Sequence, residues 1–169
     1  MKERSEKNVS SNIINNKNKF SKTIYASLGG FIAIGIIAFL ANYSSYPLIM
    51  GSFGASCVLI FGYPDSPFSQ PKNVIYGHLI STFVGLAFLH FVGPQWWSMA
   101  LALSVAIGLM ITSNTVHPPA GSNPVIIFLT NADWHFIFLP STAGSITLVI
   151  IAFIFINLSS KKLYPKSWG

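Results

Sequence analysis

The residues best suited to chemistry lie in one polar stretch, 112–124, where His117 stands among hydroxyl and amide side chains. An imidazole titrates near neutral pH and can both donate and accept hydrogen bonds. Apolar sequence surrounds the stretch, and an ionisable group at membrane depth indicates function by default. The alternative is a neutral histidine that bonds to the carbonyls freed by a broken helix. His117 is our first candidate for a functional side chain, with both interpretations open.

The two prolines after this histidine predict a break in the preceding helix. Proline lacks the backbone N–H and clashes with the turn before it, but it suits the first turn of a new helix. We expect a long helix to end near His117, and a short helix to begin at Pro118, or at Pro124 with Asn123 as its cap. The free N–H groups at such a start carry partial positive charge, which favours an anion.

A second segment, 51–56, offers the same arrangement, because Gly-Ser-Phe-Gly-Ala-Ser opens another short apolar run. Two such helix N-termini facing each other would form an uncharged pocket rich in donors. No Lys or Arg lies within a predicted span, so the pocket favours a small, weakly hydrated anion or a neutral solute. The predicted binding residues are His117, Pro118, Pro119, Gly121, Ser122, Asn123, Gly54, Ser52, Ser56, Asn114 and His78.

His78 belongs to this set because Ser81 and Thr82 follow it by one turn on the same face of a predicted helix. In one interpretation it lines the pathway. In the other it makes an ordinary hydrogen bond between two helices.

The sequence offers little for enzyme or metal chemistry. A single cysteine, Cys57, excludes an intramolecular disulfide or a cysteine cluster. Asp65 and Asp133 lie in predicted loops, and no pair of histidines has the spacing and carboxylate company of a zinc site. We expect no enzyme activity, no cofactor and no bound metal.

The composition predicts a membrane protein of one domain. The chain has 169 residues, of which 51% are hydrophobic and 8% are charged, whereas soluble domains carry about 25% charged residues. Between residues 23 and 160 the charged residues are only Asp65, Lys72 and Asp133. Such a chain cannot cover a water-exposed surface with charge, so its surroundings are the lipid bilayer.

Apolar runs divide this region into long and short segments. The long runs, 24–43, 74–92, 96–116 and 136–158, approach the roughly 20 residues that a crossing needs. The short runs are 47–61 and 118–129. We therefore predict an all-α membrane protein with four long transmembrane helices and two short broken or re-entrant helices.

The two halves of the chain resemble each other. A shift of 67 residues aligns Gly54 with Gly121, Val58 with Val125, Phe61 with Phe128 and Gly77 with Gly144. In each half a long run precedes a short one and another long run follows, so we interpret 24–92 and 96–158 as internal repeats, which are frequent in transporters. Four crossings would make the repeats parallel and six would make them inverted. We favour six, because Lys72 then lies in a cytoplasmic loop.

The net charge of +6 comes from the ends of the chain. Basic residues beside membrane spans mark the cytoplasmic side, so we expect both termini there, in a multi-pass protein of the bacterial plasma membrane, and no nucleic-acid partner. The composition of residues 1–22 predicts a disordered basic tail. The transmembrane domain is then 23–160, with a second basic tail at 161–169.

Three motifs in order resemble the HPP family of integral membrane proteins: residues 117–121 (His-Pro-Pro-Ala-Gly), residues 51–56, and residues 69–78 from Ser69 to His78. The similarity covers 45–158. It implies a compact protein with four transmembrane helices, and nitrite transport, with which plant and cyanobacterial relatives are associated. The matching positions are His117, Pro118, Pro119, Gly121, Gly54, Gln70, Pro71 and His78. Ser122-Asn123-Pro124 departs from the small residues expected there and weakens the inference to nitrite.

We hypothesise a membrane transporter or channel for a small anion, with nitrite as the best guess. A chain this small encloses a pathway with difficulty, so we expect a homo-oligomer. The alternative is a membrane protein that assembles with or regulates a partner and transports nothing.

Deletion of residues 1–20 should distinguish these two hypotheses. A transporter keeps its anion flux in liposomes after the deletion, because the spans remain intact. A scaffold that acts through its basic tail loses its partner in a pull-down. Loss of flux with folding unchanged would contradict the transporter hypothesis in this form.

Overall fold

The described part of the chain is helical and has no strand, as predicted. The structure, a computed structural model, describes residues 2–44, 48–159 and 163–168, with the side chains of residues 19–43, 48–159 and 163–168. Lys161 and Lys162 of the predicted C-terminal tail lie outside the described residues. The α-helices are α1 (Lys2–Ser44), α2 (Gly51–Gly62), α3 (Pro71–Ala87), α4 (Trp96–Thr112), α5 (Asn123–Thr130) and α6 (Ala143–Ser159). The shorter turns are η1 (Pro67–Ser69), η2 (Phe88–Val92), η3 (Pro118–Ser122), η4 (Trp134–Ile137) and η5 (Phe138–Thr142).

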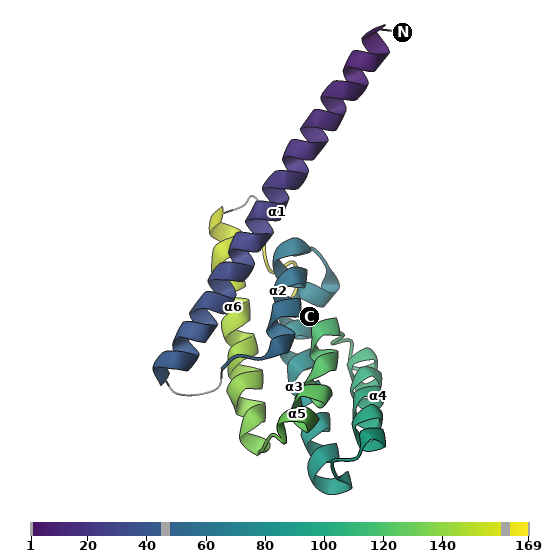
Figure 1. Ribbon diagram of the computed structural model, residues 1–169, viewed down its shortest axis with the longest axis vertical. Coiled ribbons are helices and arrows are strands. Elements are labelled where there is room, and N and C mark those ends of the chain that lie inside the picture. The colour runs from purple at the N-terminus through teal and green to yellow at the C-terminus, as the bar shows by residue number, and fades with distance from the viewer. Residues whose placement is uncertain (1, 45–47, 160–162, 169) are drawn as a thin grey trace.

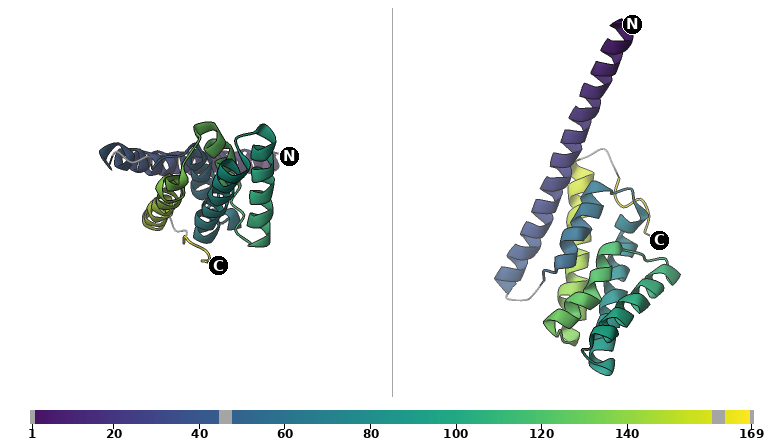
Figure 2. Two further views of the ribbon diagram at one scale, coloured as in Figure 1. Left: turned by 90° about the horizontal axis from the view of Figure 1, so that it is seen from below. Right: turned by 45° about the vertical axis from the view of Figure 1, so that its right-hand side comes forward.

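Consecutive α-helices alternate in direction along the bundle (Figure 1). The short helices α2 and α5 run in opposite directions in both Figure 1 and Figure 2, and α2 contacts η3, which leads into α5. The N-terminal end of α1 and the C-terminal end of α6 lie toward the same end of the bundle. This is the arrangement of the six-segment, inverted interpretation, although the number of crossings stays a prediction.

Three helical stretches are long and apolar enough to cross a membrane: Lys19–Tyr43, Pro71–Val92 and Trp134–Ser159. They confirm three of the four long spans. The fourth predicted run, 96–116, is shorter than expected: α4 ends at Thr112 after 17 residues and is one of the shorter apolar helices, so its crossing stays a prediction.

The early end of α4 has a cause in the backbone. Asn114 has a left-handed φ of 54°. Its N–H donates to the Ile111 carbonyl over 3.2 Å, and the Thr115 N–H donates to the Met110 carbonyl over 2.9 Å. These two bonds form a Schellman motif, in which glycine or asparagine takes the left-handed position and closes the helix. The break therefore begins at Asn114, before the prolines act.

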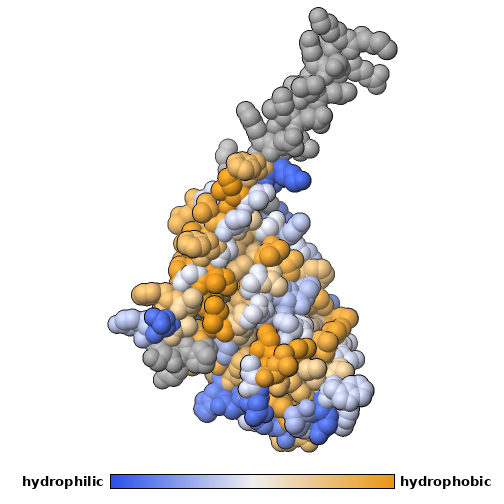
Figure 3. Space-filling view, in the orientation of Figure 1, coloured by the Kyte–Doolittle hydropathy of each residue, from blue (hydrophilic) through white to orange (hydrophobic). Residues whose placement is uncertain are grey.

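Apolar side chains cover the outside of the bundle as well as its core. On α1, Phe31 is 77% exposed and Phe39 is 66% exposed. Hydrophobic residues occupy much of the face in Figure 3, and the strongest hydrophilic colour lies toward its ends. Inside, Phe53, Ile60 and Leu148 belong to a core that joins α1, α2, α3 and α6. A large apolar exterior around an apolar core suits lipid.

Helix α1 extends back to Lys2, through the region 1–22 for which the composition predicts disorder. A helix that already exists over the apolar residues extends without a new nucleation penalty, which accounts for the difference. The boundary of a separate tail stays a prediction.

One face of α3 packs tightly along the broken segment. A Cβ on Gly77 would lie 2.7 Å from Cβ of His117, and one on Gly85 would lie 2.9 Å from Cα of Pro124. Between them, the Ser81 hydroxyl donates to the Ala120 carbonyl over 2.6 Å. Small residues allow this kind of close helix packing in a membrane. Small residues also recur at every fourth position of α4, but there they are exposed: Ala100, Ser104, Gly108 and Thr112.

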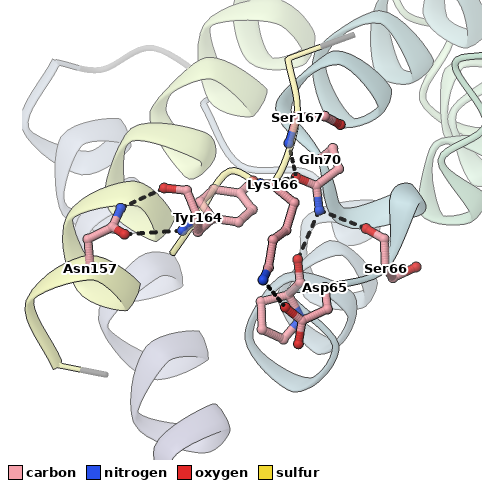
Figure 4. Close-up of polar contacts among 8 residues, drawn as sticks. Asp65, Ser66, Gln70, Asn157, Tyr164, Lys166 and Ser167 are labelled. Atoms are coloured by element: carbon pink, nitrogen blue, oxygen red, sulfur yellow. Dashed lines mark hydrogen bonds and ion pairs between the residues drawn. The ribbon is translucent and has the colours of Figure 1, made fainter. Parts of the chain in front are cut away.

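The C-terminal strap, residues 163–168, lies against the loop before α3 (Figure 4). Tyr164 is 2% exposed and its hydroxyl donates to the Ser69 carbonyl over 2.8 Å. The Asn157 amide bonds to both the N–H and the carbonyl of Tyr164. Burial raises the pKa of the Tyr164 phenol, so this side chain stays a neutral donor.

Gln70 ties the strap to the loop. Its Oε1 accepts from the backbone N–H groups of Lys166 (2.8 Å) and Ser167 (3.4 Å). Its Nε2 donates to the Pro64 and Ser66 carbonyls, each over 2.9 Å. An ion pair joins Lys166 Nζ to Asp65 over 3.4 Å. Figure 4 shows how one amide satisfies four backbone groups from two segments.

Gly77→Ala should destabilise the fold by about 1–3 kcal/mol, because the new methyl group meets the backbone and Cβ atoms of the break, which have little room to move. Gly108→Ala is the matched control, since no atom lies within 4 Å of its Cβ position. Thermal unfolding of the purified proteins in detergent measures both. Equal melting temperatures for the two variants would contradict this packing.

Gln70→Ala should release the strap, because Lys166 and Ser167 lose their shared acceptor. We expect faster cleavage by trypsin after Lys166, measured by intact mass. Cleavage after the exposed Lys22 is the internal reference and should keep its rate. An unchanged rate at Lys166 would show that Gln70 does not hold the strap.

Candidate functional site

His117 lies at the start of the broken segment and is fully buried, at 0% exposure. After α4 ends, residues 113–117 lead the chain to α3 and η1. The imidazole Nδ1 lies 2.7 Å from the Phe68 carbonyl of η1, and the neighbouring Val116 carbonyl accepts from the Asn73 amide of α3 over 2.9 Å. The backbone freed by the break is therefore bonded to other elements, as apolar surroundings require.

His78 is the second fully buried imidazole and comes from the middle of α3. Its Nδ1 lies 3.0 Å from Nδ2 of Asn123, the first residue of α5. The same amide donates to the Thr82 hydroxyl over 2.9 Å. Asn123 therefore does not cap the short helix as predicted, because its side chain points to α3. The helix begins without a side-chain cap.

A single hydroxyl joins the two histidines. Ser56, from the second turn of α2, places its Oγ 3.2 Å from Nε2 of His78 and 2.8 Å from Nε2 of His117. The centroids of the two rings lie 5.1 Å apart. All three residues are 0% exposed. Three segments thus meet at the Oγ atom of Ser56: α2 and α3 from the first half of the chain, and the break at His117 from the second half.

The partners of the two rings determine where their protons lie. The Phe68 carbonyl can only accept, so Nδ1 of His117 carries hydrogen and its Nε2 accepts from Ser56. The amide Nδ2 of Asn123 can only donate, so Nδ1 of His78 is bare and its Nε2 donates to Ser56. Rotating the Asn123 amide would make both Nε2 atoms acceptors for one serine hydrogen and would lose a bond. The orientation described here satisfies the two rings and the hydroxyl together.

Two polar atoms beside this network have no partner within the described part of the chain: Oδ1 of Asn123 and Oγ of Ser52, one turn before Ser56. An unpaired buried polar group costs about 1–3 kcal/mol. Asn123 is 0% exposed and Ser52 is 3% exposed, so neither reaches bulk solvent. A water molecule or a polar solute that reached these two unpaired atoms would gain hydrogen bonds.

A pocket of about 330 Å³ opens next to the network. Phe68, whose carbonyl holds His117, forms part of its wall, and Lys72 supplies a cationic side chain. We call it the vestibule. It is lined by Pro67, Phe68, Lys72, Asn73, Asn114, Val116 and Ser167. Neither His117 nor Ser56 belongs to this lining, although Phe68 contacts His117.

The structure brings together four of the predicted site residues, His117, His78, Ser56 and Asn123, with Ser52 beside them. Pro119 is buried in η3, and its carbonyl accepts from the Ser122 hydroxyl over 2.9 Å. Asn114 closes α4 and lines the vestibule rather than joining the network. The remaining predicted residues lie apart from it: Pro118, Gly121, Ser122 and Gly54, the last facing a groove against α1.

Sequence reasoning missed three partners in this network. Thr82 had been noted only for its place beside His78, and nothing in the sequence connected it to the hydroxyl of Ser141, 2.8 Å away. Ser141 also donates to the His78 carbonyl over 3.3 Å. The carbonyl of Phe68 leaves no trace in a side-chain pattern.

Comparisons with known proteins agree with this picture of a membrane-embedded helical unit. The chain is 35% identical over 153 residues to one transmembrane protein of Dictyostelium discoideum, covering 83% of this chain and 49% of that protein. It is 34% identical over 155 residues to a second, covering 86% of this chain and 54% of the relative. The chain thus spans about half the length of these curated relatives. No solved structure matches it.

The model of the family described as "HPP, transmembrane region" matches residues 15–165 of the chain. This range includes every element from the apolar part of α1 to the start of the C-terminal strap. The His-Pro-Pro run, residues 117–119, lies within the break that buries His117. The chain is a multi-pass membrane protein that belongs to the HPP transmembrane-region family.

Proposed function

We propose that this protein transports a small inorganic anion across its membrane, with nitrite as the first candidate. The observation that carries the proposal is the buried network of Ser56, His78 and His117 at a helix break. Non-helical backbone at membrane depth is tolerated where it lines a cavity or is buried in protein, and polar residues there mark solute pathways.

The vestibule supports an anion rather than a cation. Lys72 lies at the start of α3, where its charge adds to the partial positive charge of the helix N-terminus. Asn73, Asn114 and Ser167 surround it with neutral polar groups. Among the residues that the structure describes, no carboxylate lines this pocket. An anion held here faces the carbonyl of Phe68, and displacement of that carbonyl from His117 would open the way to the buried hydroxyl.

The proposal extends to location and assembly. The N-terminal part of α1, which carries Lys19 and Lys22, lies toward the same end of the bundle as the C-terminal end of α6 (Figure 1). We propose that this end is cytoplasmic, in a bacterial plasma membrane, because basic residues favour that side. The exposed small residues of α4 support a homo-oligomer, since small residues allow close helix contact in lipid. We propose transport without enzyme activity.

Purified protein in liposomes should take up nitrite faster than protein-free vesicles. His117→Ala should lower that flux about tenfold or more, equivalent to ~1.4 kcal/mol in the barrier, because the network loses the ring that joins it to the vestibule. His90→Ala is the matched control: His90 lies near a span end and bonds to the Ala132 carbonyl. Melting temperature and gel filtration report on folding.

Absence of flux for nitrite, nitrate and formate alike would contradict the transport proposal. So would an equal loss of flux in the His117 and His90 variants.

A further inference from the structure

The hydroxyl of Ser56 has two acceptors within reach. One is Nε2 of His117 at 2.8 Å and the other is the Ser52 carbonyl, one turn earlier on α2, at 3.2 Å. In the neutral network the hydroxyl donates to His117 and accepts from Nε2 of His78. The bond to the Ser52 carbonyl is then an unused alternative for the same hydrogen.

An additional proton on Nε2 of His117 would use that alternative. The new N–H would donate to Oγ of Ser56, and the serine hydrogen would turn to the Ser52 carbonyl. Oγ would then accept from both imidazoles and donate once, which is the full capacity of a hydroxyl. Nδ1 of His117 would keep its bond to Phe68. Both states satisfy the two rings and the serine hydroxyl without moving a heavy atom.

The network has room for one additional proton and not for two. The remaining bare nitrogen, Nδ1 of His78, faces the donating amide of Asn123, so a second proton would place two donors against each other. Two charged rings with centroids 5.1 Å apart would also repel.

Apart from the two imidazoles, no described side chain near the buried hydroxyl supplies a positive charge that could balance an anion. His78 is packed against Phe53 of α2, Asn123 of α5 and the His117 ring. His117 is packed against Gly77 of α3 and bonded to η1 and α2. Within the described side chains, no carboxylate, lysine or arginine contacts either ring. Lys72, six residues before His78 on α3, remains in the vestibule.

We propose that this network is a proton site, and that its proton crosses the membrane together with the anion, one for one. The second part rests on the proposed transport function. The lone pair of Nε2 takes a proton from water that enters when the Phe68 contact opens, and an N–H bond forms while the O–H bond of the hydronium breaks. On the far side the imidazolium returns the proton to water as the anion leaves. No net charge moves.

Transport of nitrate or nitrite by the full chain in liposomes tests the coupling. A pH dye inside the vesicles should report one proton entering per anion, and clamping the membrane potential with potassium and valinomycin should leave the rate unchanged. Protein-free vesicles give the background. Anion flux that generates a potential without internal acidification would overturn the coupling and leave the transport proposal intact.

Nitrogen NMR of ¹⁵N-histidine-labelled protein in lipid tests the proton site without any transport. As the pH is lowered from about 8 to about 3, one buried ring should pass from the neutral to the doubly protonated form while the other stays neutral. Ser56→Ala should shift that transition by roughly one pH unit or more, because the shared acceptor is lost, and Ser56→Thr should restore it. Ser98→Ala is the control: Ser98 is 0% exposed, and its hydroxyl has no partner among the described groups.

If no buried histidine changes its protonation over this range, the proton site itself is wrong, whatever the flux. If the Ser56→Ala and Ser98→Ala proteins titrate alike, Ser56 does not govern it. If the site titrates but no anion moves, the transport function fails while the proton site stands.

Discussion

The structure depends on one constraint: backbone polar groups freed by a helix break inside lipid must find partners within the protein. Between Thr112 and Asn123 the chain leaves regular α-helix. The Val116 carbonyl is bonded by Asn73, the Ala120 carbonyl by Ser81, and the backbone of η1 receives the His117 ring. Most of these donors come from α3, whose glycines let the break lie against its backbone. Helix α3, which supplies most of the hydrogen-bond donors to the break, therefore also carries His78.

A long helix also packs closely, through a glycine, against the other short segment. Gly144 of α6 is the counterpart of Gly77 in the shifted alignment. A Cβ on Gly144 would meet the Phe53 ring and would lie 2.8 Å from the Leu48 carbonyl oxygen. Each long helix thus uses an aligned glycine to admit the short segment of the opposite half. This reciprocal contact is consistent with a duplicated unit of opposite orientation. It also explains how Ser56 of one half reaches His117 of the other.

Much of this architecture could be read from the sequence, because a bilayer restricts the choice so strongly. The apolar runs predicted the helices, and the His-Pro-Pro motif predicted a break near His117. The length of α4 could not be predicted from apolarity, since a left-handed Asn114 ends it within an apolar run. Asn123 looked like a cap because its position suits one, and only the approach of α3 turns it toward His78. The sharing of one hydroxyl by two rings is a tertiary property that no local pattern records.

The central claim is that the break around His117 is where the anion passes, and anomalous diffraction tests it most directly. Bromide is a small, weakly hydrated anion whose position can be located by its scattering. In crystals grown with bromide, the account predicts a peak between Lys72 and the His117 ring, weakened or lost in Ser56→Ala and His117→Ala proteins. Peaks confined to the surface outside the vestibule, with none near His117 in the wild-type protein, would contradict it.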